Sequence, residues 1–494
     1  MRRTIVLVTI ALLGAMIAAP VFAAGTQEAE AASTEPLVCY VPGGAGYPYN
    51  DTDEQAVYDA VNELLTQDLG TTVDIRVEGA FGEYDERMPL ILASGEKMDL
   101  LWTAVWSNDF LQNASDGFYA GLDDLLEEHG QDILADIGEQ LEATRVDGEI
   151  RAVWSQQIAA YNSIFRVRMD LVEEYGWDLD SVESLADLEP WLGQVQENEQ
   201  DLIPFGPGSE AWKLIQPYYG IGTFGFLDGV LGIRVDDESL EVLDLTTTPE
   251  YREWTELMYD WQQKGYIPED GLTYTRDQWS QLSNQARLAF SHHNTYNPQI
   301  AEREVAGVMM KDVRIGEPMT LTSNITNTLH AVHSGSQQKE KAVQVLNWLW
   351  TNQEAYNMLV WGLEGQHYES IGDERISPIQ DSGYYTNLPW MWGNTFQSYL
   401  LPGQDETLFD EVRRLNRESL KANILGFNAD RGEVSTLVAS VSAVVDQYET
   451  PLEGGWVDPE TGIPEFQAAL ERAGFPDLIE QMQAQVDAWA EVNR

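Results

Sequence analysis

The stretch MPLILASGEKMDLLW, residues 88–102, passes from the end of one regular element to the start of another. Its first part continues a helical spacing of apolar residues that begins at residue 84 and stops at Ser94-Gly95. Its last part is a short run of apolar residues. Glycine commonly follows the end of a helix, and a short apolar run is typical of a buried strand. The stretch therefore predicts a helix over 84–93 and a strand over 98–105.

The same alternation extends towards the N-terminus. Apolar runs at 37–41 and 72–77 predict strands, and the apolar spacing over 51–69, followed by Gly70, predicts the helix between them. Strands that alternate with helices in this way need crossover connections, which makes the strands parallel. We therefore expect an open α/β sheet.

The rest of the chain continues the mixed pattern. Asp147-Gly148 lies between two β-prone stretches and predicts a hairpin. Ser336 is the expected cap of a strongly apolar helix over 339–351. Further helices are expected at 169–175, 185–195 and 249–264, with two more in 464–489 separated at 474–476. Further strands are expected at 286–290 and 329–332.

Length and charge limit what the chain can be. Its 494 residues exceed what a single hydrophobic core supports, so two or three lobes are expected. With 82 acidic and 28 basic residues, the net charge is −54, which disfavours nucleic acid and anionic lipid as partners. The 16 Trp and 21 Tyr supply enough rings for cores and for a binding cleft.

The N-terminus has the features of an export signal. Two arginines precede an apolar run over 5–18, and residues suited to cleavage follow, which predicts a signal peptide over 1–23. Residues 24–35 are small and acidic, and are expected to form a flexible leader. The cleavage point carries no cysteine for lipid attachment, and Cys39 lies in an apolar strand as an expected buried thiol. A periplasmic protein without a lipid anchor is expected.

Several motifs resemble those of bacterial extracellular solute-binding proteins of family 1, the binding components of ABC importers. They include the stretch 88–102, the hairpin at 146–153 and the strand at 286–290. The segment WGLEGQHY, residues 361–368, resembles a motif of a LipO-like subgroup with a C-terminal domain of unknown function. The tail resembles that domain at Gly426-Phe427, 445–448, Gly455, Asp458-Pro459, Ala473-Gly474 and 485–489.

This resemblance implies a periplasmic-binding-protein type II fold, in which two α/β lobes are joined by a multi-stranded hinge and the ligand lies between them. We expect the chain to cross between the lobes near Gln156, Ala286 and Thr326. The expected division is 36–155 with 286–325 in lobe 1, 156–285 with 326–400 in lobe 2, and 401–494 as a helical C-terminal domain packed on the lobes.

The candidate site follows from the sheet. In open α/β sheets ligands bind beyond the carboxyl ends of strands, and the loops at 42–50, 79–84 and 102–108 carry rings and polar groups there. Rings stack on the C–H faces of sugars, while polar side chains bond their hydroxyls. For each ring, packing inside a lobe is the competing interpretation. The predicted ligand-binding residues are Tyr47, Tyr84, Trp102, Trp106, Trp154, Tyr161, Asn294, Trp390 and Trp392.

No metal, cofactor or catalytic site is predicted. The His292-His293 and His330/His333 pairs fall short of the three or four converging ligands that zinc needs, and no nucleophile or metalloprotease motif is present. We expect a monomeric, non-enzymatic protein that binds a sugar or oligosaccharide and delivers it to an ABC permease. The alternatives are a secreted glycan-active enzyme with an aromatic cleft, or a binding protein for peptides, a metal or other solutes.

Overall fold

The computed structural model describes residues 35–44, 46–208, 211–293, 301–372, 374–379 and 381–493. The predicted signal peptide and all but the last residue of the predicted leader lie outside these ranges. Within the ranges described, no helix has both the length and the apolar character that a membrane crossing requires.

The elements predicted around residues 88–102 are confirmed. Helix α2 (Phe81–Ser94) is followed by Gly95, whose φ of 73° lies in the left-handed region that favours glycine. Strand β3 (Leu100–Thr103) follows and is fully buried. The sequence pattern thus places this helix, its end and its strand correctly.

The first sheet has the strand order β2-β1-β3-β15-β6. Strand β1 (Leu37–Gly43) pairs in parallel with both β2 (Val73–Ala80) and β3, and the predicted helix is α1 (Asp51–Leu69). Strand β1 is buried along its whole length because it lies between two strands. Cys39 in β1 is a buried free thiol, as predicted.

Two strands complete this sheet from distant parts of the chain. Strand β15 (Leu329–Val332) runs antiparallel to β3, and β6 (Val153–Trp154) pairs with β15. The predicted hairpin is formed by β4 (Arg145–Val146) and β5 (Glu149–Ile150). We call the part of the molecule built on this sheet lobe 1. Its helices besides α1 and α2 are α3 (Phe110–Ser115), α4 (Asp123–His129), α5 (Gln131–Ile137), α12 (Lys339–Thr351) and α13 (Gln353–Trp361).

The second large sheet has the order β13-β14-β7-β12-β8 and forms the centre of lobe 2. Strand β12 (Leu288–His293) is parallel to β8 (Ile203–Gly206) and antiparallel to β7 (Tyr161–Arg168), which in turn pairs with β14 (Val308–Thr320). Strand β13 (Glu302–Val305) forms the edge. The helices of this lobe include α6 (Met169–Tyr175), α7 (Glu189–Asn198), α8 (Ala211–Ile215), α9 (Pro249–Gln263) and α10 (Arg276–Asn284). Lobe 2 also contains a small sheet in which β10 (Leu231–Arg234) lies between β9 (Ile221–Gly222) and β11 (Leu243–Asp244). A separate two-stranded sheet is formed by β16 (Tyr368–Gly372) and β17 (Arg375–Pro378).

The predicted division into lobes is wrong for two segments. Residues 286–325 were expected in lobe 1, but their strands β12 and β14 pair with β7 in lobe 2. Residues 326–400 were expected in lobe 2, but β15 pairs with β3, and α12 and α13 pack into the core of lobe 1. A strand's apolar pattern fixes its buried faces and leaves open which sheet it joins.

The chain crosses between the lobes at positions that differ in part from those expected. One crossing, between β6 and β7, includes the predicted Gln156. Another passes from β14 through α11 (Thr322–Ile325) to β15 and includes the predicted Thr326. No crossing occurs at Ala286, because the strand that follows it stays in the sheet of lobe 2. Helix α14 (Leu408–Glu418) lies against the first crossing, where Asn416 Oδ1 accepts a hydrogen bond from Ala159 N (2.8 Å).

Ser336 is not the cap of the apolar helix. That helix, α12, has Gln338 at its N-cap position, with no side-chain capping bond. Ser336 instead donates to Asp99 Oδ1 (2.5 Å) and accepts from Gln338 N (3.0 Å). The hydroxyl therefore serves the buried carboxylate of the neighbouring strand end.

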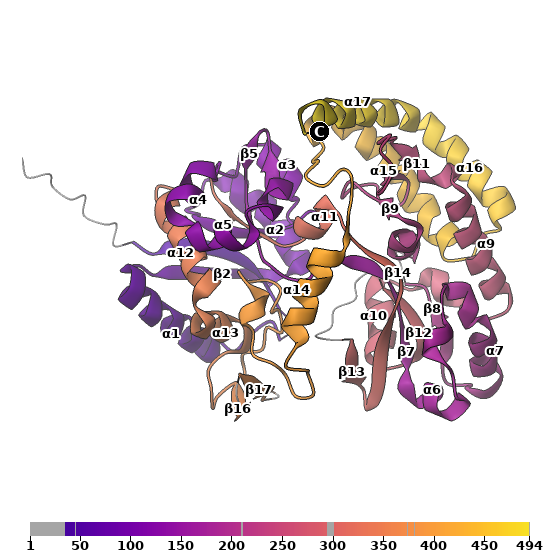
Figure 1. Ribbon diagram of the computed structural model, residues 1–494, viewed down its shortest axis with the longest axis horizontal. Helices are drawn as coiled ribbons and strands as arrows, with labels where there is room; N and C mark the ends of the chain where they lie inside the picture. The colour runs from indigo at the N-terminus through magenta and orange to yellow at the C-terminus, as the bar shows by residue number, and fades with distance from the viewer. Residues whose placement is uncertain are drawn as a thin grey trace, which may run out of the picture. The chain divides into compact units, whose positions relative to one another are not determined.

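The C-terminal helices belong to the core of lobe 2. Helices α15 (Arg431–Glu453), α16 (Pro459–Arg472) and α17 (Phe475–Asn493) supply buried side chains to that core, and the short strand β18 (Leu420–Lys421) pairs with β14. In Figure 1 α15 and α16, coloured towards yellow, lie beside α9, and α17 packs against α15 and α16. The approach is close: a Cβ at Gly455 would stand 2.2 Å from the Met258 carbonyl oxygen of α9, so only glycine fits. Of the predicted break at 474–476, Gly474 lies between α16 and α17, whereas Phe475 and Pro476 already belong to α17.

Candidate functional site

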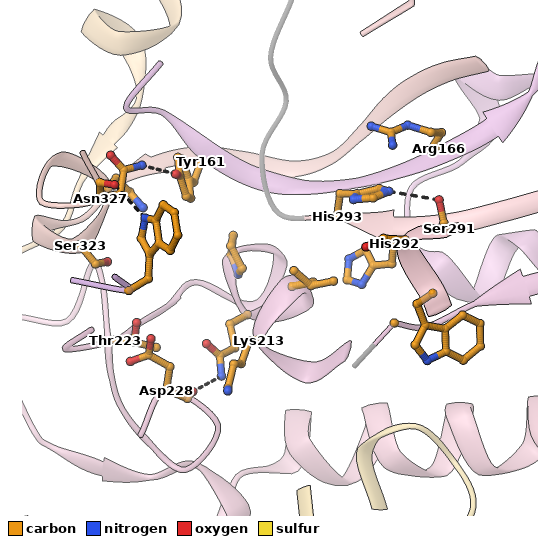
Figure 2. Close-up of a pocket in the computed structure, with 18 of the residues that line it drawn as sticks. Tyr161, Arg166, Lys213, Thr223, Asp228, Ser291, His292, His293, Ser323 and Asn327 are labelled. Carbon is orange, nitrogen blue, oxygen red and sulfur yellow. Dashed lines mark hydrogen bonds between the residues drawn. The ribbon is translucent and has the colours of Figure 1, made fainter. Parts of the chain in front are cut away.

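A cavity of about 780 Å³ lies between the two lobes (Figure 2). Its walls include the residues that follow β3 in lobe 1, and the carboxyl ends of β8 and β12 in lobe 2. Ligands bind at the carboxyl ends of strands in open α/β sheets, and the volume falls within the range of small-molecule sites. The expected position of the site therefore coincides with a cavity of suitable size.

Trp106 contributes the most exposed ring of the lining. It lies just after β3, is 48% exposed and contacts the rings of Phe81, Trp102 and Trp390 at centroid distances of 5.2, 5.4 and 6.4 Å. Its indole Nε1–H donates to the Asn327 carbonyl (2.8 Å). The aromatic contacts and this hydrogen bond restrain the ring, so Trp106 offers a pre-organised apolar surface to the cavity.

The crossing segments form one edge of the cavity. Tyr161, the first residue of β7, lines the cavity, and its hydroxyl accepts a hydrogen bond from the side-chain amide of Asn327. Figure 2 shows Tyr161 and Asn327 next to each other. Because Asn327 belongs to the segment between β14 and β15, this bond joins that crossing to the one between β6 and β7 beside the ligand space.

Two neutral histidines form the carboxyl end of β12. Burial lowers the pKa of His292 to about 3, and burial together with the neighbouring positive charge of Arg166 lowers the pKa of His293 well below its ordinary value. His293 Nε2 lies 3.1 Å from the Ser291 hydroxyl (Figure 2), and His292 is 3% exposed. Each neutral imidazole has one donor and one acceptor, a combination that suits sugar hydroxyls.

A buried ion pair lies behind these histidines. Arg166 on β7 donates through Nε and Nη2 to both carboxylate oxygens of Asp312 on β14, at 2.6 and 2.9 Å. Arg303 Nη1 lies 3.8 Å from the same carboxylate. Arg166 also lines the cavity, so a fixed guanidinium faces the ligand space.

Lys213 connects the cavity to the C-terminal helices. It lies on α8, lines the cavity and forms an ion pair with Glu449 of α15 (3.0 Å). Gln216, one turn later, donates to the Asp228 carbonyl (2.6 Å). Figure 2 shows Lys213 and Asp228 on the same wall. The polar groups of this wall are therefore held by contacts within lobe 2.

Two of the nine predicted residues line the cavity, namely Trp106 and Tyr161. Asn294 lies outside the described residues. The prediction that the ring faces a ligand is wrong for four residues, because their rings pack in the core of lobe 1. They are Tyr84, Trp102, Trp154 and Trp392, at 0, 0, 2 and 6% exposure.

Tyr47 and Trp390 are partly buried and lie outside the described lining. Tyr47 packs edge-on against Tyr49 (5.7 Å between centroids), and Trp390 stacks on Phe81 (5.8 Å). Trp390 reaches the site only by supporting the ring of Trp106.

Sequence reasoning missed Trp279, Arg166, Lys213 and Asp228, which all line the cavity. Trp279 is a single large ring in the otherwise polar helix α10, and that contrast could have identified it. The charged residues carry no such signal, because strand and helix periodicity does not distinguish a charge that faces a groove from one that faces solvent.

Glu453 of α15 provides a pH-dependent test of the packing behind Lys213. Burial raises its pKa well above the usual value, assisted by the charge of Glu449, and Tyr251 donates to it (3.1 Å). A carboxyl with a raised folded-state pKa makes the fold most stable at acid pH, and this advantage is lost as pH rises through the folded-state pKa. We expect Glu453→Gln to stabilise the protein by about 0.5–2 kcal/mol at neutral pH, with the difference shrinking near pH 4.

Thermal unfolding between pH 4 and pH 8 checks this expectation. Glu433→Gln on the same helix removes an exposed carboxyl and serves as the control. A Glu453→Gln variant that is less stable than the parent protein at neutral pH would show that the ionised carboxylate is needed.

With this geometry in place, comparisons with known proteins identify the fold. The structure of the N-glycan transport solute-binding protein NgtS from Streptococcus pneumoniae is similar at a TM-score of 0.80, with 23% identity over 93% of this chain and 100% of that chain. A second similar structure is the "HMO binding" ABC-transporter-associated solute-binding protein from Bifidobacterium longum infantis, at a TM-score of 0.64 with 15% identity over 92% of this chain and 99% of that chain. The type II solute-binding fold expected from the motifs is thereby confirmed.

Sequence comparison gives the same result. A carbohydrate ABC transporter substrate-binding protein of Streptococcus pneumoniae serotype 4 is 27% identical over 440 residues, or 86% of each chain. Residues 423–491 match a domain of unknown function, DUF3502. The resemblance to the binding components of ABC importers, with a C-terminal domain of unknown function, is confirmed.

Proposed function

We propose that this protein is the exported binding component of an ABC importer, and that it captures an oligosaccharide in the cavity between its lobes. The observation that carries this proposal is the cavity itself. It combines a pre-organised ring, Trp106, with Trp279 and Tyr161 and with hydroxyl, amide and imidazole groups from both lobes and the crossings. Rings and neutral polar groups in one groove match the two kinds of surface that a sugar presents.

The names of the relatives support the same ligand class. The NgtS structures include complexes with Man1GlcNAc and Man5GlcNAc, and another structure of this fold, FusA from Streptococcus pneumoniae, holds kestose at a TM-score of 0.63. The proposal also includes delivery of the sugar to a membrane permease and a periplasmic location. They rest on the relatives' role in ABC transport and on the predicted signal peptide.

A glycan-hydrolysing enzyme is the weaker alternative. Glycosidases generally use a pair of carboxyl groups that flank the scissile bond. Among the described residues that line the cavity, Asp228 is the one carboxylate. Binding without chemical change therefore fits the site better.

Calorimetry with Man5GlcNAc, Man1GlcNAc and kestose tests the proposal. We expect binding of at least one sugar with a Kd near or below about 1 μM, which corresponds to about −8 kcal/mol. The same sugar at a hundredfold excess over its Kd should stabilise the fold by about 2.7 kcal/mol, with no new reducing ends released. New reducing ends would support the enzyme instead. The absence of heat with a wider set of oligosaccharides would redirect the search to peptides and other solutes.

A further inference from the structure

We infer that the C-terminal domain positions the walls of the binding cavity, and that Arg431 is the positioning residue. Arg431 is the first residue of α15 and lies within the part of the chain that matches the domain of unknown function. Its Nη1 lies 2.6 Å from Oδ2 of Asp109 in lobe 1. This ion pair connects a helix rooted in the core of lobe 2 to the opposite lobe.

The lobe 1 end of the pair lies next to the ligand space. Asp109 follows the loop that carries Trp106, and its Oδ1 accepts from Gln112 N (3.2 Å) at the start of α3. The Asp109 carboxylate therefore caps helix α3, which follows this loop, and also binds Arg431. Asp109 is three residues after Trp106, so a shift of Asp109 also shifts the loop that carries Trp106.

Arg431 also contacts the opposite wall. Its guanidinium carbon lies 5.1 Å from the ring centroid of Phe226, which is 8% exposed. Phe226 belongs to the segment 223–228, of which Thr223, Gly225 and Asp228 line the cavity. Gly225 faces lobe 1 directly, because a Cβ on it would lie 3.6 Å from Val105. Arg431 thus contacts Asp109 in the segment of the lobe 1 wall and Phe226 in the segment of the lobe 2 wall, close to where the two walls meet.

A second contact joins the same two parts of the molecule. Asn428, three residues before Arg431, donates through Nδ2 to the carbonyls of Ala143 (2.8 Å) and Arg145 (3.1 Å) in lobe 1. These bonds and the ion pair lie outside the crossing segments that connect the lobes covalently. The C-terminal domain therefore adds a separate, non-covalent connection between the lobes.

Such a connection affects binding more than stability. The side chains of Arg431 and Asp109 are 19% and 41% exposed, and ion pairs of that kind contribute little to folding. A contact that exists in one arrangement of the lobes nevertheless shifts the population towards that arrangement. Because Arg431 contacts segments of both cavity walls, loss of the pair should leave the walls less firmly positioned and speed the release of ligand.

The first test measures ligand release. Arg431→Met, Asp109→Asn and the double variant are compared with the parent protein for Kd and dissociation rate, with the oligosaccharide found by calorimetry as the probe. We expect each single variant to raise the dissociation rate about two- to fivefold and the double variant to add little more. The control is Arg252→Met, which removes an ion pair between α9 and Glu460 of α16 (3.0 Å) that stays within lobe 2. Additive effects, or unchanged rates in the Arg431 and Asp109 variants, would overturn the inference.

The predicted effect on affinity rests on the proposed function, but the connection between the lobes does not. The second test therefore measures that connection in the absence of ligand. Spin labels at Glu63→Cys on α1 and Glu173→Cys on α6, both exposed, report the distance between the lobes. Cys39 is buried, and burial raises the pKa of its thiol to about 12, so it should escape labelling. We expect Arg431→Met to broaden the distance distribution of the free protein and Arg252→Met to leave it unchanged.

The two tests separate the possible failures. If no sugar binds the parent protein but Arg431→Met still broadens the interlobe distances, the oligosaccharide proposal fails and the inferred connection stands. If Arg431→Met lowers the melting temperature while the distances stay as in the parent protein, Arg431 is merely structural and the inference is overturned. Rescue of narrow distances by the exchanged pair Asp109→Arg with Arg431→Asp would support it.

Discussion

Replacing Trp106 by alanine is expected to weaken oligosaccharide binding by about 10- to 100-fold, or roughly 1.4–2.8 kcal/mol. This ring is the most exposed large apolar group in the cavity, and neighbouring rings and one hydrogen bond already hold it in place. Stacking of a ligand on this ring therefore costs the protein little conformational entropy. Removal of the ring therefore removes the stacking surface without a compensating gain in entropy.

Calorimetry on three variants resolves the contribution of the ring from that of its hydrogen bond. Trp106→Phe keeps an aromatic face but loses the donor to Asn327, and should fall between the parent protein and Trp106→Ala. Trp348→Ala is the matched control. Its indole is also partly buried and hydrogen-bonded, to Asp68 (2.7 Å), but it lies on α12, outside the described lining. Equal losses from Trp106→Ala and Trp348→Ala would point to general destabilisation and would contradict a stacking role.

Trp106 also shows why the candidate site was only partly predictable. Its loop follows β3, and the rule that ligands bind beyond the carboxyl ends of strands identified it from the sequence. The same rule selected Trp102, which is fully buried. The two rings are only four residues apart, yet Trp102 is buried and Trp106 is exposed, because β3 ends between them. Composition alone cannot locate that end to within one residue.

The fold was predicted well where local patterns decide it, and poorly where distant pairing does. Helices α1, α6 and α12 begin and end as their apolar spacing indicated. The strands at 288–293 and 329–332 were also found, yet both were assigned to the wrong lobe. Their sheets are chosen by partners more than 80 residues away in the sequence, which periodicity does not reveal.

The buried pair formed by Arg166 and Asp312 is expected to give the largest effect on stability. Arg166→Met should destabilise the protein by about 3–5 kcal/mol, because it leaves the Asp312 carboxylate without its bidentate partner. That carboxylate is 1% exposed, and the two residues lie opposite each other in the β7–β14 register. Arg303, 3.8 Å from Asp312, can compensate only in part, which favours the lower end of this range.

A double variant distinguishes the cost of an unpaired charge from the loss of a stabilising interaction. With Arg166→Met and Asp312→Leu together, both charges disappear and apolar side chains fill the space, so most of the loss should be recovered. Arg413→Met, which removes an exposed ion pair with Asp410 (3.3 Å), should cost less than about 1 kcal/mol in the same denaturant titration. A double variant as unstable as Arg166→Met would instead mean that the pair itself holds β7 and β14 in register. Since Arg166 lines the cavity, that result would make the ion pair a structural condition for the binding site as well.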